Sequence, residues 1–221
     1  MIKKIFAGLE KGSAKWSGYF DVYEKHLKKF IGKSPKIIEI GIFDGGSLEL
    51  WEKYFGNDSQ IFGIDISEQC LAQKHGPNTK VILGDQGDPS FWSNFLNKRT
   101  GFDIIIDDGS HTMRDQIITL ETLYPHLNVG GVYIVEDTHT SYWDGWHSSG
   151  YGTFLEYSKR MTDIVNKEHF RGKTPVSNNE LDNYKNLYSV TFYNSMVVFE
   201  KEEYKEFDIV DLTNKRNLHL L

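Results

Sequence analysis

Short hydrophobic runs alternate along the middle of the chain with segments in which apolar residues recur at helical spacing. The runs predict strands at 36–41, 60–65, 80–84, 102–107 and 132–136, and the segments between them predict helices at 47–55, 67–75, 89–98 and 112–127. Strands that alternate with helices form parallel sheets with helices packed on both faces. The central part of the chain is therefore expected to be an α/β domain.

The ends of the chain depart from this alternation. Residues 19–31 have the apolar spacing of an amphipathic helix, and Pro35 marks its boundary. A loop rich in Gly, Ser and aromatic residues is expected at 138–152. Two further apolar runs, 187–193 and 196–200, predict a hairpin that adds an antiparallel strand at one edge of the sheet.

The composition is that of an ordinary globular protein, and it narrows the choice of partners. The chain has 221 residues, of which 39% are hydrophobic and 25% are charged. Its net charge of −6 argues against a nucleic-acid partner, which would need a basic face. The single Cys70 permits no internal disulfide and fits the cytoplasm, a reducing compartment. We expect neither a signal peptide nor an integral membrane segment, because no apolar run is long enough.

A glycine-rich turn joins the first predicted strand to the first predicted helix. It runs Glu39-Ile-Gly41-Ile-Phe-Asp-Gly45-Gly-Ser47, and Ser47 is the expected helix cap. Glycine lets the backbone approach a ligand closely, and a helix amino terminus offers free N–H groups. The spacing differs from the G-x-G-x-x-G fingerprint of dinucleotide binding. The turn is therefore either a cofactor site or an ordinary strand-to-helix connection.

The alternating strands, the closing hairpin and the Glu-x-Gly turn together resemble the class I methyltransferases. That resemblance implies a Rossmann-like fold with a seven-stranded, mostly parallel sheet, an antiparallel final strand and helices on both faces. It also implies S-adenosylmethionine as the cofactor, with Glu39, Gly41, Gly45 and Ser47 in its binding site.

Polar side chains follow the next three strands, at the edge where ligands bind in open α/β sheets. Asp65 can accept both hydroxyls of a ribose, or it can cap the following helix. In methyltransferases an acid or amide after the third strand often meets the adenine, which implies Asp85 and Gln86, although both can be plain turn residues. Asp107 ends the fourth strand and is expected to take the ammonium group of the cofactor.

Two pairs of acids end the fourth and fifth predicted strands. These are Asp107-Asp108, with His111 shortly after, and Glu136-Asp137. Carboxylates on adjacent strands repel one another unless a cation or a proton lies between them. Oxygen ligands without a nearby cysteine suit Mg²⁺, and also Mn²⁺. A cation would stabilise a developing oxyanion and His111 could accept a hydroxyl proton, whereas the alternative is helix capping beside a solvated histidine.

Three longer motifs resemble a group of bacterial metal-dependent sugar O-methyltransferases, which includes macrolide and rhamnosyl O-methyltransferases and proteins called cephalosporin hydroxylase-like. The motifs are Asp107-Asp-Gly-Ser-His111, Glu136-Asp-Thr-His-Thr-Ser-Tyr-Trp143 and Thr191-Phe-Tyr-Asn-Ser-Met-Val-Val-Phe-Glu200. The resemblance implies methyl transfer to a sugar hydroxyl that depends on S-adenosylmethionine and Mg²⁺, with His111 as the base. It implies four candidate metal ligands: Asp108, Asp137, Glu136 and Glu24.

The aromatic loop at 138–152 is expected to cover the acceptor. The flat ring of Trp143 can stack on a pyranose, and Tyr142 and His139 lie close to it in the sequence. Exposed loops of this length are more often functional than inert. The alternative is a surface crossing whose aromatic residues pack on the core.

The predicted organisation is a helical cap segment at 1–34, a methyltransferase domain at 35–202 and a tail at 203–221. The expected partner is a small-molecule or glycan acceptor, and the expected assembly is a homo-oligomer. Two other functions stay open: an O-methyltransferase for a catechol or other phenolic acceptor, and a catalytically silent subunit that binds S-adenosylmethionine or a sugar. The presence of His111 beside both acid pairs favours an enzyme.

Overall fold

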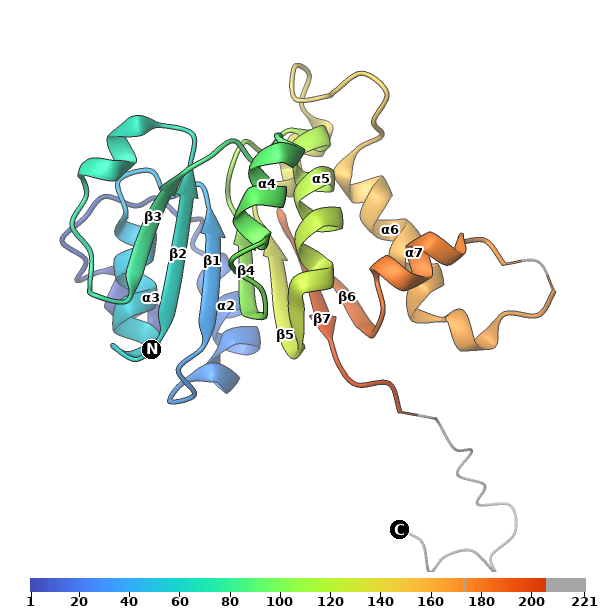
Figure 1. The fold of residues 1–221 in the computed structure, drawn as a ribbon, viewed down its shortest axis with the longest axis horizontal. Coiled ribbons are helices and arrows are strands. Elements are labelled where there is room, and N and C mark those ends of the chain that lie inside the picture. Colours follow the sequence, from blue (N-terminus) through green and yellow to red (C-terminus); the bar gives the residue numbers. More distant parts are fainter. Residues whose placement is uncertain (173, 206–221) are drawn as a thin grey trace, which may run out of the picture.

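The centre of the molecule is a seven-stranded sheet with the strand order β3-β2-β1-β4-β5-β7-β6 (Figure 1). The computed structural model describes residues 1–172 and 174–205. The strands are β1 (Lys36–Ile40), β2 (Gln60–Asp65), β3 (Thr79–Leu83), β4 (Phe102–Asp107), β5 (Leu127–Val135), β6 (Leu187–Tyr193) and β7 (Met196–Lys201). Strands β1 to β5 pair in parallel, and β7 runs antiparallel to both β5 and β6. The predicted seven-stranded, mostly parallel fold is confirmed.

Helices cover both faces of this sheet. In Figure 1, α4 (Pro89–Leu96) and α5 (Met113–Leu123) lie in front of the sheet, whereas α2 (Tyr19–Leu27) and α3 (Gly46–Phe55) lie behind it. The other helices are α1 (Ile2–Phe6), α6 (Phe154–Val165) and α7 (Asn178–Asn183), with 3-10 turns η1 (Lys28–Phe30), η2 (Glu68–Ala72), η3 (Tyr124–His126), η4 (Thr138–Tyr142) and η5 (Lys167–His169).

Successive residues of the strands belong alternately to two separate hydrophobic cores, one on each face of the sheet. Ile38 and Ile105 belong to the core under α4 and α5, while Ile37 and Ile104 belong to the core under α2 and α3. This division follows from the alternation of side chains along a strand. A strand that is buried on both faces must be apolar throughout, which explains the unbroken hydrophobic runs in the sequence.

The outermost strand on the hairpin side of the sheet differs from the prediction. The hairpin forms as expected, but its second strand, β7, inserts between β5 and β6. The antiparallel strand is therefore internal, and β6 forms the edge. Burial explains this order, because β7 is buried along almost its whole length whereas β6 is only partly covered.

Two other elements have different bounds from those predicted. The segment at 67–75 forms only the 3-10 turn η2, whose cap is Ser67. The helix expected to reach residue 127 ends at Leu123, and β5 begins at Leu127. Pro125 falls in the 3-10 turn between them, where a proline interrupts helical hydrogen bonding.

The first residues of the chain pack on the core behind the sheet. Helices α1 and α2 contribute Ile2, Tyr23 and Leu27 to it. Between these helices, residues 10–16 cross the start of α3, where the backbone N–H of Gly46 donates to the carbonyl of Gly12 at 3.1 Å. Residues 10–16 therefore lie directly against the glycine-rich turn. Of the predicted tail at 203–221, residues 206–221 lie outside the described part of the chain.

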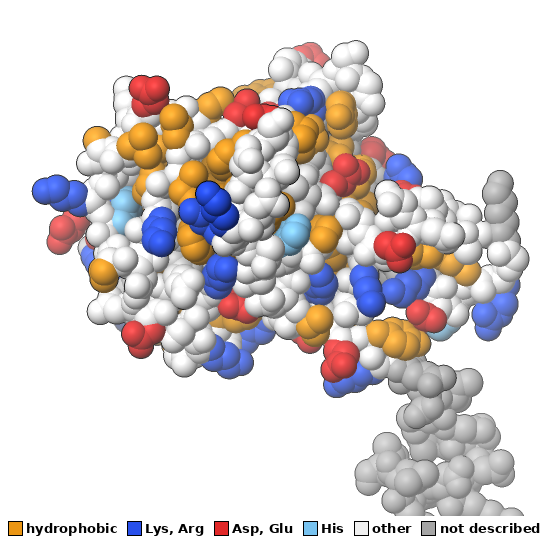
Figure 2. Space-filling model, in the orientation of Figure 1, with side chains coloured by type: hydrophobic (Ala, Val, Ile, Leu, Met, Phe, Trp, Pro, Cys, Tyr) orange, Lys and Arg blue, Asp and Glu red, His pale blue; other side chains and the backbone are white. Residues whose placement is uncertain are grey.

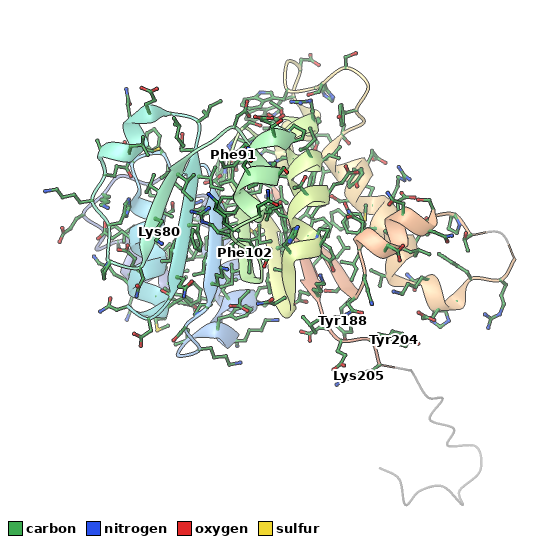
Figure 3. All side chains as sticks on the ribbon, viewed as in Figure 1. Lys80, Phe91, Phe102, Tyr188, Tyr204 and Lys205 are labelled. Carbon is green, nitrogen blue, oxygen red and sulfur yellow. The ribbon has the colours of Figure 1, made fainter. Side chains whose placement is uncertain are left out.

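The outer surface is mixed in character. Figure 2 shows charged side chains of both signs interspersed with hydrophobic ones on the face that carries α4 and α5. A hollow of about 740 Å³ lies at the amino ends of β5 and β6, and Tyr188, Tyr204 and Lys205 are among the residues that line it (Figure 3). It is at the opposite end of the sheet from the predicted acid pairs. None of the helices in the described residues is long and apolar enough to cross a membrane.

Candidate active site

The acid pairs lie together at the edge formed by the carboxyl ends of the parallel strands. Asp107 of β4 pairs in register with Val135 of β5, so the residues that follow each strand are neighbours. This edge is uppermost in Figure 1, where the loop at 138–152 rises beside it. His111 and Asp137 adopt left-handed backbone angles there, with φ of 58° and 52°. Such angles are uncommon outside glycine and tend to occur at functional sites.

Three of the predicted site residues converge on one position. His111 Nε2 lies 4.0 Å from Asp108 Oδ1 and 3.7 Å from Asp137 Oδ2. One ligand atom from each residue lies within 4.8 Å of the other two. Each side chain keeps 20–25% of its surface exposed, so solutes can reach the group. This arrangement could hold a divalent cation beside an imidazole.

A buried lysine neutralises the inner side of this group. Lys15 Nζ lies 2.5 Å from Asp108 Oδ2, 2.9 Å from Glu136 Oε2 and 3.8 Å from Glu39 Oε1. Burial disfavours the ammonium, but the surrounding carboxylates outweigh that effect and hold the pKa of Lys15 well above its usual value. Burial raises the pKa of Glu39 to about 7, although Lys15 opposes the shift. Three carboxylates thus share one internal cation.

Two of the four candidate metal ligands do not join His111. Glu136 is fully buried, and its carboxylate accepts hydrogen bonds from Lys15 and from the Tyr23 hydroxyl. Glu24 instead contacts the amino group of Met1 at 2.8 Å. Successive residues of a helix point about 100° apart, so Glu24 turns away when Tyr23 faces the sheet. Glu24 therefore lies apart from the group around His111, and Glu136 lies with Lys15 on the inner side.

Asp65 holds the glycine-rich turn in place. Its Oδ2 accepts hydrogen bonds from the backbone N–H groups of Ile42 and Phe43 at 3.0 and 3.2 Å. Its Oδ1 accepts the backbone N–H of Ser67 at 2.9 Å, and Ser67 is the cap of the following turn. Gly41 and Gly45 have φ of 80° and 78°, which only glycine adopts without strain. The turn is therefore fixed by its own residues at the edge of the sheet.

Ser47 and Glu39 face inward from this turn. Helix α3 begins at Gly46 after Gly45, so Ser47 is not its cap. The Ser47 side chain instead lowers the pKa of Glu39, and Trp51 Nε1 donates to Glu39 Oε2 at 3.0 Å. The other oxygen of Glu39 has no hydrogen-bond partner within the described chain.

Gln86 supports Asp107 and does not face outward. Gln86 Nε2 donates to Asp107 Oδ1 at 3.1 Å, and Gln86 Oε1 accepts from the backbone N–H of Ser110. Gln86 is buried whereas Asp85 is exposed, so only Asp85 is placed to meet a ligand after β3. Asp107 is fully buried, and burial raises its pKa to about 7. Its Oδ2 has no hydrogen-bond partner in residues 1–172 and 174–205.

The predicted acceptor residues stand beside the convergent group. The rings of His139 and Trp143 meet edge to face with centroids 4.4 Å apart. The Trp16 ring also lies near His139, with centroids 6.1 Å apart. Tyr142 and Trp143 are exposed. These aromatic rings are available to a ligand rather than packed in a core.

Sequence reasoning missed the residues that the N-terminal segment brings to the site. Trp16 Nε1 and the Tyr19 hydroxyl donate to Asp137 Oδ1 at 3.1 and 2.6 Å, and Lys15 binds the inner acids. The aromatic content of residues 16–23 was visible in the sequence. No local pattern, however, indicates that the preceding residues fold back over the sheet edge.

Comparisons with known proteins bear on this geometry, although no model of a known protein family matches the chain. The chain is 34% identical over 167 residues to the 8-demethyl-8-alpha-L-rhamnosyl tetracenomycin-C 2'-O-methyltransferase of Streptomyces olivaceus, which covers 70% of the chain and 43% of that protein. It is 28% identical over 191 residues to the mycinamicin VI 2''-O-methyltransferase of Micromonospora griseorubida, which covers 81% of the chain and 47% of that protein.

A solved structure gives the same result. The MycE methyltransferase from the mycinamycin biosynthetic pathway, in complex with Mg and SAH, matches with a TM-score of 0.76 and 26% identity, over 91% of this chain and 53% of that one. The chain belongs to the class I methyltransferase family of these proteins. The family resemblance in its motifs is thereby confirmed. This methyltransferase chain spans about half the length of the curated relatives that it matches.

Proposed function

We propose that this class I methyltransferase transfers a methyl group from S-adenosylmethionine to a sugar hydroxyl of a polysaccharide, glycolipid or glycosylated metabolite, with the help of Mg²⁺ or Mn²⁺. The observation that carries the proposal is the convergence of Asp108, His111 and Asp137 at the sheet edge. The relatives support it, because their names describe O-methyltransferases for sugar-bearing molecules and the MycE structure holds Mg and SAH. When bound, the cofactor supplies the methyl group and the cation supplies positive charge at the acceptor oxygen.

The donor set fits a hard divalent cation. Asp108 and Asp137 offer carboxylate oxygens, which Mg²⁺ and Mn²⁺ prefer. One oxygen of each faces His111 and is not tied to another side chain at hydrogen-bond distance. Sulfur ligands, which would favour other metals, are missing from this group.

The inner side of the site fits a cofactor that carries an ammonium group and a ribose. Asp107 Oδ2 and Glu39 Oε1 are buried oxygens without a hydrogen-bond partner among the described residues, and an ammonium group would satisfy either of them. Asp65 and Asp85 stay at the outer edge for the ribose and the base. We assign the cofactor to these four acids and to Gly41 and Gly45, with Ser47 and Gln86 acting through Glu39 and Asp107.

His111 is the proposed general base. Its Nε2 faces the two carboxylates, and its buried Nδ1 has no hydrogen-bond partner in the described part of the chain. A sugar hydroxyl is a weak acid, so removal of its proton during methyl transfer is worth ~10²–10⁴ in rate. Tyr142, Trp143 and His139 would hold the acceptor, because aromatic rings can stack on the apolar face of a pyranose.

Calorimetry with S-adenosylhomocysteine, with and without Mg²⁺, tests both the proposed cofactor site and the proposed cation site. We expect the cofactor product to bind the native chain, and Asp137→Ala to lose Mg²⁺ binding while it keeps S-adenosylhomocysteine. Mg²⁺ binding that is unchanged in Asp137→Ala would contradict the ligand assignment. Methyl transfer from labelled cofactor to rhamnosyl compounds, compared with catechols, then separates a sugar acceptor from a phenolic one.

The wider setting of the enzyme is also part of the proposal. The edge strand β6 exposes Tyr188 and Phe192, which supports a homo-oligomer, and light scattering in solution would measure its size. The single cysteine, Cys70, is free and buried, which supports a reducing compartment such as the cytoplasm.

A further inference from the structure

The N-terminal segment holds both carboxylates of the proposed cation site from one side. Lys15 Nζ contacts Asp108 Oδ2 at 2.5 Å. Trp16 Nε1 and the Tyr19 hydroxyl donate to Asp137 Oδ1 at 3.1 and 2.6 Å. The opposite oxygens, Asp108 Oδ1 and Asp137 Oδ2, are the ones that face His111 Nε2, at 4.0 and 3.7 Å. Each carboxylate therefore has one fastened oxygen and one free oxygen, and the free oxygens point to the same place.

We propose that Trp16 and Tyr19 are positioning residues for a divalent cation, that Lys15 is a fixed positive charge that opposes its binding, and that residues 15–19 therefore set the affinity of the cation site. The inference rests on the proposed function, since it concerns the ligands assigned there. A donor that fixes one oxygen of a carboxylate also fixes the direction of the other. Outer contacts of this kind are typically worth ~10- to 100-fold in metal affinity.

The burial and the hydrogen bonds of Tyr19 suit it to position Asp137. It is the first residue of α2 and only 3% exposed, so packing fixes its ring. Its hydroxyl donates to the Asp137 side chain and also accepts the Asp137 backbone N–H at 3.1 Å. One phenol thus holds both the carboxylate and the left-handed backbone of Asp137, whose φ is 52°.

The segment that carries these residues is itself anchored to the cofactor side of the molecule. The Glu49 carboxylate of α3 accepts the backbone N–H groups of Glu10 and Lys11 at 3.0 to 3.1 Å. The N–H of Gly46 donates to Gly12, and a Cβ at Gly46 would lie 2.5 Å from that carbonyl oxygen. The glycine turn and the cation ligands are therefore joined through residues 10–19.

Removal of Lys15 should raise the affinity for the cation, whereas removal of either aromatic residue should lower it. Trp16 and Tyr19 are neutral, so their loss changes the orientation of Asp137 without a change of charge, although the Tyr19 hydroxyl also contacts Ser195. Lys15 carries a positive charge against Asp108, and like charges at short range oppose a second cation. Its removal also leaves Glu39, Asp108 and Glu136 without their shared counter-charge. At Lys15 the effect of charge on the cation affinity should therefore exceed the effect of orienting Asp108.

The test is a titration of the full chain with Mn²⁺, in which electron paramagnetic resonance measures the free ion at pH 8. The variants are Trp16→Phe, Tyr19→Phe and Lys15→Met, with Asp137→Ala as the ligand control. Tyr188→Phe on the distant strand β6 is the matched tyrosine control. We expect Trp16→Phe and Tyr19→Phe each to weaken Mn²⁺ at least ten-fold, and Lys15→Met to tighten it at least ten-fold. Tyr188→Phe should leave the affinity unchanged.

A second readout follows the indole directly. Trp16 touches Asp137, so Mn²⁺ or Mg²⁺ should change the tryptophan fluorescence of the native chain, and that change should be smaller in Trp16→Phe. Trp16 is 61% exposed, so its substitution spares the core even where Tyr19→Phe does not fold.

The outcomes separate this inference from the function on which it rests. Native affinity in both Trp16→Phe and Tyr19→Phe, together with loss of binding in Asp137→Ala, would overturn the positioning role and leave the proposed function intact. A native chain that binds no Mn²⁺ would overturn both. Weaker binding by Lys15→Met would overturn the assignment of Lys15 as an opposing charge.

Discussion

Glu39 and Asp107 differ from Asp108 and Asp137 in how far water reaches them. The first two are fully buried, and burial raises the pKa of each to about 7. The second two keep 20–25% of their side chains exposed. Within one sheet edge the chain therefore separates acids that suit a desolvated ammonium group from acids that suit an ion arriving from solvent.

The role of His111 can be tested by its removal. In His111→Ala we expect turnover to fall by ~10² or more, because His111 is the one histidine that joins Asp108 and Asp137 in this group among the described residues. The affinities for S-adenosylhomocysteine and Mg²⁺ should stay within a few-fold of native, since oxygen ligands dominate the cation site. Initial rates and calorimetry on the same preparation check both statements. A variant with native turnover would remove the base role, and one that loses Mg²⁺ would make His111 a ligand.

Individual elements show which parts of the site the sequence could predict. The acids after β4 and β5 were predictable, because hydrophobic runs locate the strands and parallel strands end at one edge. The position of Glu24 away from this group was predictable, since helical periodicity already turns Tyr23 inward. Lys15 was not predictable, because its position depends on a contact between Gly12 and Gly46 that no local pattern encodes.

The packing of α2 against β7 gives a prediction about pH. A hydrogen bond from His26 at 3.2 Å, helped by Ser189 and opposed by partial burial, lowers the pKa of Glu200 from 4.5 to about 2. A lowered carboxyl pKa adds stability above pH 4.5 that is lost as the pH falls toward 2. Glu200→Gln should therefore lose about 1 kcal/mol of unfolding free energy at pH 6, after allowance for its partial exposure.

Urea unfolding at pH 6 and at pH 3 measures this contribution. The difference between Glu200→Gln and the native chain should shrink at pH 3. The exposed neighbour Glu202, altered to Gln, serves as the control and should change little at either pH. An equal deficit at both values of pH would show that the loss comes from packing and not from the charge.

At the scale of the whole molecule, the proposed binding site lies between two parts of one chain. The sheet edge supplies the acids and His111, and residues 10–19 close over them from the side of α3. Both cores lie beneath this edge, and the described hollow near Tyr204 is at the other end of the strands. Ligands that bridge the two parts should therefore stabilise the entire fold.

Thermal unfolding checks that expectation. Saturation at ~100 times the dissociation constant adds about 2.7 kcal/mol for each ligand. For a chain of 221 residues, S-adenosylhomocysteine should then raise the midpoint by about 5–10 °C, with a further rise from Mg²⁺. EDTA should abolish only the Mg²⁺ increment, and Asp137→Ala should lack it from the start. Equal midpoints with and without the ligands would mean that the edge binds neither.

The left-handed backbones of His111 and Asp137 have a consequence for how such a protein evolves. Each costs about 1 kcal/mol that glycine would recover. Selection for thermal stability alone should therefore favour glycine at both positions, although glycine would remove two side chains of the proposed cation site. A related chain that carries glycine there should be more stable and should lack the proposed activity.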